Sequence, residues 1–296
     1  MRYIMAGTLS VLFAASTAVS TLGPHPVTVE SADGILIHGW YIHPGTHDVV
    51  HAEDESFFAQ YPAVVLLHMY GGGKGDWGPL LGEFFARDVA ALAIDMRGHG
   101  ESTIGIDGED LSIGVLNRDE ALFNSMWQDA NAAVDWLVAK GHRKDRIALL
   151  GASVGCSVAI DTARRDPKLR VVGVLSPGAK YLGVDTIAHL DNWDDRSLLI
   201  VSSEAEWGSG AKQIKERLEQ AQSENGKKNI PVVWKLQGTG REVHGTRMFG
   251  QVEGIEDRLL DWFELRLSPA DEIQKDEKSN NPTPQNVSPE ATSGGS

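Results

Sequence analysis

The chain has 296 residues, of which 42% are hydrophobic and 23% are charged, and this suits one large globular domain with a substantial core. Its formal net charge of −14 argues against a nucleic-acid partner, because phosphate backbones need a basic protein surface. A single cysteine, Cys156, excludes an intramolecular disulfide, and the ten histidines follow no spacing typical of a metal site.

Residues 1–20 have the pattern of a secretory signal peptide. Arg2 supplies a positive charge, residues 4–19 are apolar and uncharged, and the small residues Ala18 and Ser20 favour cleavage before Thr21. This apolar run is shorter than the roughly 20 residues that a membrane-spanning helix needs. We therefore expect export to the periplasm or the medium. If uncleaved, the segment would anchor the chain to a membrane, and no other stable membrane insertion is expected.

Hydrophobic patterning then predicts an opening hairpin followed by alternating strands and helices. The turn at residues 31–34 ends in Asp33-Gly34 and separates two apolar runs, 27–30 and 35–42, which is typical of a β-hairpin. Continuous apolar runs predict buried strands at 63–67 and 89–94, and further strands are predicted at 146–150, 171–175, 198–201 and 232–236. Helical spacing predicts helices at 80–87, 127–138, 156–165, 214–221 and 255–267.

This alternation predicts an α/β fold: a doubly wound, mostly parallel sheet with the antiparallel N-terminal hairpin at one edge. We expect one domain over residues 21–267. The glycine-rich, acidic stretch 101–116 is expected to loop over the top of the sheet. Residues 268–296 have few large apolar side chains, so they predict a disordered tail.

A nucleophile motif stands between a predicted strand and a predicted helix. The sequence Gly151-Ala152-Ser153-Val154-Gly155 follows the run at 147–150 and precedes the helical run from residue 156. In that setting the GxSxG pattern is typical of a sharp turn that exposes the serine hydroxyl above the sheet, with glycines where helix and strand approach closely. Ser153 is therefore the predicted nucleophile.

Two long stretches of the chain resemble α/β-hydrolases of the dienelactone hydrolase and acetyl xylan esterase-like group. They read RIALLGASVGCSVAIDTARRDPKLRVVGVLSPG and AVVLLHMYGGGKGDWGPLLGEFFARDVAALAIDMRGHGES. The resemblance covers about residues 27–267 and implies the α/β-hydrolase fold. It also implies that residues 68–72 carry an oxyanion-hole amide and that residues 95–102 shape the top of the site.

A serine hydroxyl needs a base, and in this fold the chain order is serine, acid, histidine. The resemblance places the catalytic histidine at His244, between the last predicted strand and the last helix. The acid departs from the family pattern, because Glu204-Ala205-Glu206 stands where an aspartate is usual. Glu206 aligns best and can still hold the imidazole tautomer. Glu204 is the alternative, and Asp185 is a more distant one.

The oxyanion of the reaction needs two donors placed in advance. One is expected to be the backbone N–H of Val154, directly after the nucleophile. The other is expected to be the N–H of Met69 or Tyr70. The hydroxyl of Tyr70 is a further possibility, or its ring only lines the acyl pocket.

These residues predict a serine hydrolase that cleaves a small-molecule carboxylic ester through an acyl-enzyme, without metal or organic cofactor. A peptidase or amidase of the same fold stays open. So does a catalytically inactive relative that binds a ligand, because the acid position departs from the family pattern.

Overall fold

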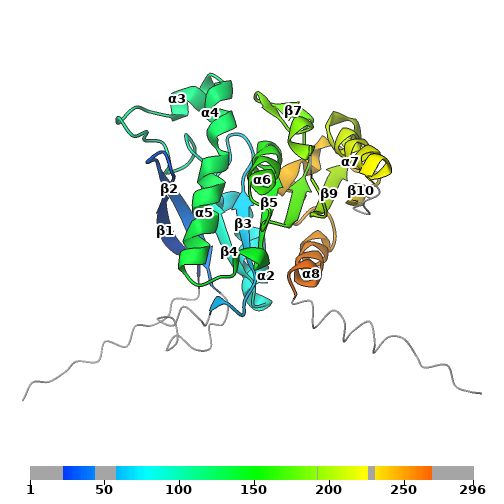
Figure 1. Cartoon of the computed structure of the whole chain (residues 1–296), viewed down its shortest axis with the longest axis horizontal. Helices are drawn as coiled ribbons and strands as arrows, with labels where there is room; N and C mark the ends of the chain where they lie inside the picture. Colours follow the sequence, from blue (N-terminus) through cyan, green and yellow to red (C-terminus); the bar gives the residue numbers. More distant parts are fainter. Residues whose placement is uncertain (1–22, 44–57, 192, 226–230, 269–296) are drawn as a thin grey trace, which may run out of the picture.

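The computed structural model describes residues 23–43, 58–191, 193–225 and 231–268 (Figure 1). The predicted signal peptide and all of the predicted tail beyond residue 268 lie outside these ranges. Within them, every helix is too short or too polar to cross a bilayer.

One eight-stranded sheet forms the centre of the molecule, in the order β1-β2-β4-β3-β5-β6-β9-β10. The hairpin strand β1 pairs antiparallel with β2, and β2 pairs antiparallel with β4, whereas the remaining neighbours in this sheet are parallel. This confirms the predicted mostly parallel sheet with an antiparallel N-terminal edge. The strands are β1 (His25–Glu30), β2 (Leu36–Ile42), β3 (Ala63–Leu67), β4 (Ala90–Ile94), β5 (Ile147–Ala152), β6 (Val171–Leu175), β9 (Ser197–Ser203) and β10 (Val232–Leu236).

Helices cover both faces of the sheet, which produces two separate cores (Figure 1). Side chains alternate along a strand, so Val65 packs in the core under one helical layer while its neighbour Val64 packs in the other. Burial on both faces explains why the central strands read as continuous apolar runs. One layer holds α5 (Trp127–Ala139), α6 (Val154–Arg165) and α7 (Ala211–Asn225), and the other holds α2 (Gly78–Ala86) and α8 (Ile255–Leu267).

Two small insertions lie above the carboxyl ends of the strands (Figure 1). The stretch expected to be a loop contains helix α3 (Ser112–Leu116) and is followed by α4 (Glu120–Ser125), so that expectation was wrong in part. Val115 is the buried residue of helix α3 and anchors the segment to the core, whereas Ile113 and Leu116 of the same helix are exposed. After β6, β7 (Lys180–Tyr181) and β8 (Val184–Asp185) form a short hairpin, and the Asn124 amide of α4 donates to the carbonyl of Gly183 at 3.2 Å.

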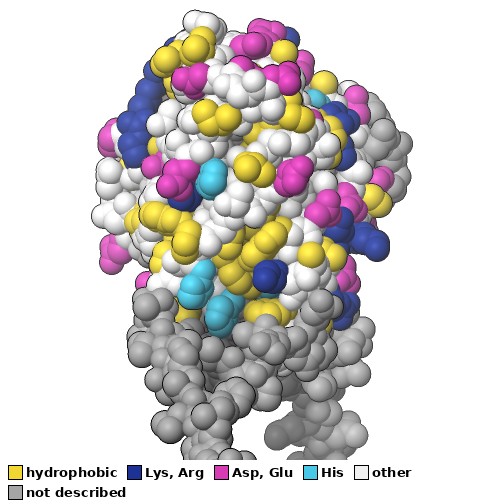
Figure 2. Space-filling view, turned by 90° about the vertical axis from the view of Figure 1, so that its left-hand side faces the viewer, with side chains coloured by type: hydrophobic (Ala, Val, Ile, Leu, Met, Phe, Trp, Pro, Cys, Tyr) yellow, Lys and Arg dark blue, Asp and Glu magenta, His cyan; other side chains and the backbone are white. Residues whose placement is uncertain are grey.

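One face of the molecule carries side chains of both charge types (Figure 2). On the described part of the face in Figure 2, acidic and basic side chains lie among hydrophobic ones, and Lys and Arg side chains form a strip along the upper left.

Candidate active site

Ser153 occupies the turn between β5 and α6 in a strained backbone conformation. Its φ is 52° and its ψ is −115°, a combination that residues with a Cβ rarely adopt. Such strain persists only where the surrounding structure holds it, and it is common at functional sites. The turn therefore has the geometry of a nucleophile elbow.

The two glycines of the motif are required by close backbone contacts. A Cβ at Gly151 would overlap the carbonyl of Gly155, and a Cβ at Gly155 would overlap the carbonyl oxygen of Leu67 in β3. Only glycine permits helix α6 to start this close to strands β5 and β3. The motif thus brings Ser153 next to the segment that follows β3.

His244 lies between two 3₁₀ turns, η6 (Arg241–Val243) and η7 (Gly245–Met248), which follow strand β10. Its Nδ1 lies 2.9 Å and 3.0 Å from the two carboxylate oxygens of Glu206. A carboxylate only accepts hydrogen bonds, so Nδ1 carries the proton and Nε2 is left as an acceptor. Glu206 is itself oriented by Ser203, whose hydroxyl donates to Glu206 Oε2 at 3.3 Å and accepts the Glu206 N–H at 3.2 Å.

The other two carboxylates considered from the sequence lie elsewhere. Glu204 accepts from the Lys235 ammonium at 3.1 Å and from the backbone N–H of Gly238 at 3.0 Å, on the exposed side of the β9 loop. Asp185 accepts the N–H of Ala188 at 3.1 Å. Among the three, Glu206 alone contacts the His244 ring.

Ser153, His244 and Glu206 all line one pocket of about 390 Å³. In the described part of the chain, no hydrogen bond joins the Ser153 hydroxyl to the histidine ring. Contacts of this kind are often loose in unliganded hydrolases and tighten when substrate binds. The pocket therefore gathers a serine hydroxyl, an imidazole ring and a carboxylate around one space that a small molecule can enter.

Ser176 is a residue of this pocket that the sequence reasoning missed. It follows β6 directly with φ of 56°, and its Oγ accepts the backbone N–H of Gly245 at 3.0 Å. That bond ties the carboxyl end of β6 to the residue after His244, so Ser176 positions the histidine loop. The available signal was a serine at the end of a buried strand, followed by Pro177 and Gly178.

The expected oxyanion donors sit beside the elbow. Val154 is the first residue of α6, where an N–H has no partner within the helix. Met69 packs against the histidine loop, since a Cβ at Gly245 would overlap its sulfur. The hydroxyl of Tyr70 donates to the carbonyl of Val115 at 3.3 Å, so that hydroxyl is engaged away from the pocket.

His68 shapes the backbone at these donors. Its Nε2 accepts the N–H of Met96 at 3.0 Å and its Nδ1 donates to the carbonyl of Met69 at 2.7 Å. Burial, with a smaller effect of the neighbouring His99, lowers the pKa of His68 to about 3, so the ring is neutral at physiological pH. His68 thereby connects the ends of β3 and β4 as a fixed neutral link.

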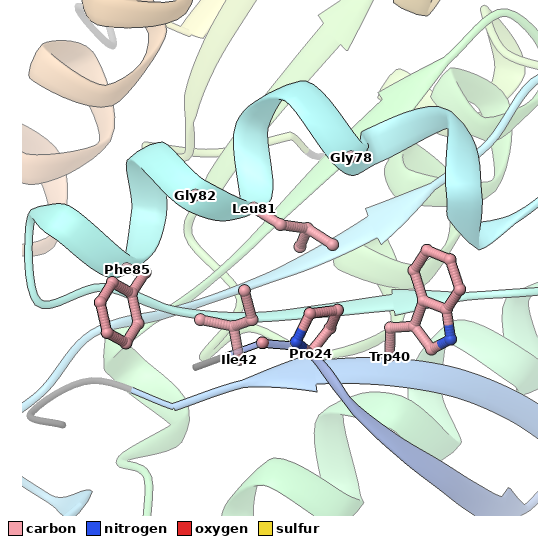
Figure 3. Close-up of a pocket in the computed structure, with 8 residues that line it drawn as sticks. Pro24, Trp40, Ile42, Gly78, Leu81, Gly82 and Phe85 are labelled. Carbon is pink, nitrogen blue, oxygen red and sulfur yellow. The ribbon is translucent and has the colours of Figure 1, made fainter. Parts of the chain in front are cut away.

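Three other features do not add chemistry to the site. Cys156 is buried, its thiol donates to the carbonyls of Gly151 and Leu175, and burial raises its pKa. Among the described residues, no cluster of His, Cys, Asp or Glu has the arrangement to hold a metal ion. A second pocket of about 370 Å³ lies between β2 and α2 (Figure 3), lined by apolar and glycine residues that include Trp40 and Phe85, without a titratable group.

Part of the chain matches a family of known proteins. A family model described as serine aminopeptidase, S33, matches residues 60–192, a range that contains Ser153 but ends before Glu206 and His244. Comparison with curated proteins gives no match.

Solved structures match over most of the described chain. The alpha/beta hydrolase GrgF from a Penicillium species has 15% identity and a TM-score of 0.61, over 83% of this chain and 99% of that chain. An esterase from Pyrococcus furiosus has 18% identity and a TM-score of 0.59, over 82% of this chain and 90% of that chain. An acylaminoacyl peptidase from Pyrococcus horikoshii has 14% identity and a TM-score of 0.58, over 82% of this chain but 41% of that chain.

The chain has the α/β-hydrolase fold. In this fold the nucleophile follows the central strand, and the acid and histidine follow later strands. Ser153 after β5, Glu206 after β9 and His244 after β10 keep that order. The finer resemblance to the dienelactone hydrolase and acetyl xylan esterase-like group stays a prediction.

Proposed function

We propose that this chain is a serine hydrolase that cleaves carboxylic esters through an acyl-enzyme intermediate. The observation that carries the proposal is a strained serine that shares one pocket with a histidine held by a carboxylate. Each element has a chemical reason, because a serine hydroxyl is a weak nucleophile until a positioned base accepts its proton.

In the first half of the proposed reaction, Ser153 Oγ attacks the acyl carbon while His244 Nε2 takes its proton. The carbonyl electron pair moves onto oxygen, and the N–H groups of Val154 and of Met69 or Tyr70 stabilise that charge, each by about 3 kcal/mol. Glu206 stabilises the imidazolium that forms. The intermediate then collapses, the bond to the alcohol breaks, and His244 protonates the leaving alkoxide.

In the second half, His244 accepts a proton from water as the water oxygen attacks the acyl-enzyme. Collapse of the second intermediate breaks the bond to Ser153, which recovers its proton from the imidazolium, and the carboxylic acid leaves. No step in this cycle requires a redox change, and the residues named supply every proton transfer.

A second candidate function is hydrolysis of an amide or peptide by the same residues. It is favoured by the description of the matched family as a serine aminopeptidase and by the likeness to an acylaminoacyl peptidase. The two reactions differ in the leaving group, which is an alkoxide in one case and an amine in the other.

Substrate panels on the purified protein test the proposal. We expect hydrolysis of short-chain 4-nitrophenyl esters with kcat/KM at least about 100-fold above that of the matching aminoacyl 4-nitroanilides, and loss of both in Ser153→Ala. Preference for the anilides would favour the peptidase. Absence of Ser153-dependent turnover on either panel would favour a catalytically inactive binding protein.

A further inference from the structure

Two basic side chains line the pocket that holds Ser153 and His244. Lys180 lies on β7, and Arg241 begins the 3₁₀ turn η6 that leads to the histidine. The two come from insertions after β6 and after β10, which are 61 positions apart in the chain and meet only at this pocket. Both residues are exposed at the pocket rim, where a ligand can reach them.

Neither cation makes an ion pair within the described residues. Glu206 is the one carboxylate among the lining residues, and its oxygens are taken by His244 and Ser203. Glu242, next to Arg241 in the chain, accepts the N–H of Gly240 and does not line the pocket. The pocket therefore presents two positive charges without a protein counter-ion, on a chain whose net charge is −14.

The walls of this pocket also indicate which part of a substrate enters it. His244 and Glu206 line it, whereas Met69 and Tyr70, one of which is expected to supply an oxyanion donor, do not. The leaving oxygen takes its proton from His244 Nε2, so the group attached to that oxygen extends on the histidine side of the serine. The pocket with Lys180 and Arg241 is thus on the leaving-group side.

We propose that Lys180 and Arg241 bind a carboxylate on the alcohol part of the ester, so that the substrate is an ester of a hydroxy acid. This inference rests on the proposed function of the same pocket. The planar guanidinium of Arg241 matches a carboxylate with two parallel hydrogen bonds, and the Lys180 ammonium adds a point charge. The same charges disfavour substrates with a free amino group, since no unpaired carboxylate lines the pocket.

Chromogenic esters that carry a carboxylate on different parts of the molecule test which part of the substrate contacts Lys180 and Arg241. We compare 4-nitrophenyl acetate, which has a neutral leaving group, with 5-acetoxy-2-nitrobenzoate, which carries a carboxylate on the leaving group, and with mono-4-nitrophenyl succinate, which carries it on the acyl group. After correction for spontaneous hydrolysis, we expect kcat/KM to be about tenfold higher for the acetoxynitrobenzoate than for either other ester. Added salt should reduce this preference, because the cations are exposed.

Substitutions of Lys180 and Arg241 test whether these two side chains cause the preference for the acetoxynitrobenzoate. Arg241→Gln and Lys180→Gln should each lower kcat/KM for the acetoxynitrobenzoate about tenfold and change the neutral ester less than about twofold. Arg247→Gln and Lys168→Gln are the controls, since both cations are outside the pocket lining and Arg247 lies as far after His244 as Arg241 lies before it. Equal losses on both esters, or preference for the succinate, would overturn the proposal.

Binding of the free hydroxy acid product tests the anion site without requiring ester hydrolysis, so the two proposals can fail independently. Calorimetry with 5-hydroxy-2-nitrobenzoate needs no turnover, and we expect its Kd to rise about tenfold in Arg241→Gln but not in Arg247→Gln. If esters are not hydrolysed but this binding difference holds, the proposed function fails and the anion site stands. Equal binding to both variants and the wild type would reject the anion site.

Discussion

Two glutamates two positions apart have different surroundings. Glu206 contacts the His244 ring, whereas Glu204 is bonded to Lys235 and to the Gly238 backbone. The sequence left the choice open because both follow β9 in an irregular turn, where side-chain direction has no period to read. The structure separates them through Ser203, whose hydroxyl accepts the Glu206 N–H and orients its carboxylate.

Neutralising Glu206 should therefore affect the reaction far more than neutralising Glu204. For Glu206→Gln we expect kcat on a 4-nitrophenyl ester to fall about 10²- to 10⁴-fold, because the imidazole tautomer is no longer held and the imidazolium loses its counter-charge. Glu204→Gln should stay within about twofold of the wild type. Steady-state kinetics on both variants check this, and a larger loss in Glu204→Gln would reassign the acid.

His68 should make stability depend on pH. Burial lowers its pKa to about 3, below the ordinary 6.5, so the unfolded chain takes up this proton first as pH falls. Its contribution to stability is intact above pH 6.5 and is lost as pH falls toward 3. Between pH 7 and pH 5 we expect the free energy of unfolding to fall by about 2 kcal/mol more in the wild type than in His68→Gln.

Urea unfolding at the two pH values, followed by tryptophan fluorescence, measures this difference. Comparison with the variant cancels the other groups that titrate in the same range. Parallel pH dependence in the two proteins would mean that His68 takes up a proton as readily in the folded state as in the unfolded chain.

Among the elements, the turn from β5 to α6 depends on the glycines two positions before and two positions after Ser153. In Gly155→Ala the new methyl group meets backbone atoms of β3, which cannot move as a flexible side chain can. We expect a loss of at least about 2 kcal/mol in the free energy of unfolding. Gly82→Ala is the matched control, because Gly82 lies inside α2 with open space around it and should gain up to about 1 kcal/mol.

Chemical denaturation of these two variants measures both effects. If Gly155→Ala proved as stable as the wild type, the close approach of helix α6 to β3 would be wrong. A full loss of folding in Gly155→Ala alone would agree with the account, since Gly82→Ala shows that the added methyl is otherwise tolerated.

The elements predicted from sequence were those with continuous apolar runs or helical spacing. Strand β6 and helix α8 match their predicted bounds, because a buried apolar run and an amphipathic helix each have a clear signal, and the partly exposed edge strand β10 matches its bounds as well. The short elements α3, α4, β7 and β8 were not predicted. They are held by tertiary contacts, such as the bond from Asn124 to Gly183, that no local pattern contains.

At the scale of the whole molecule, Arg97 connects parts of the chain that are distant in sequence. Its guanidinium donates to both oxygens of Asp33 in the hairpin turn, at 2.6 and 2.9 Å, and to Asp129 of α5 at 2.8 Å. The Arg97 side chain is 3% exposed and that of Asp129 is fully buried. This network connects the turn between β1 and β2, at the N-terminal edge of the sheet, to helix α5, which covers it.

Removing the guanidinium would leave a buried carboxylate without its partner. We expect Arg97→Met to lose about 3–5 kcal/mol in the free energy of unfolding, measured by urea denaturation. Arg170→Met is the control, because its ion pair with Asp195 is exposed on both sides and should contribute less than about 1 kcal/mol. Similar losses in the two variants would contradict a structural role of the buried network.

Part of the pocket around Ser153 could not be predicted from the sequence, because its residues come together only in the folded chain. Ser153 was identifiable because its motif is contiguous and lies between a strand and a helix. The pocket around it is built by loops after β6, β9 and β10, which meet only in the folded chain. Ser176, Lys180 and Arg241 stand in the connections that follow β6 and β10, and nothing local distinguishes them from solvated positions.

The reactivity of one serine is the most direct test of this account. A fluorophosphonate probe reacts with a serine only when a base activates its hydroxyl, and mass spectrometry identifies the modified residue. We predict one adduct, on Ser153, which is absent in Ser153→Ala, strongly slowed in His244→Ala and unchanged in Ser209→Ala, whose serine lines the same pocket. No adduct on the folded wild-type protein, or an adduct on another serine, would contradict the account.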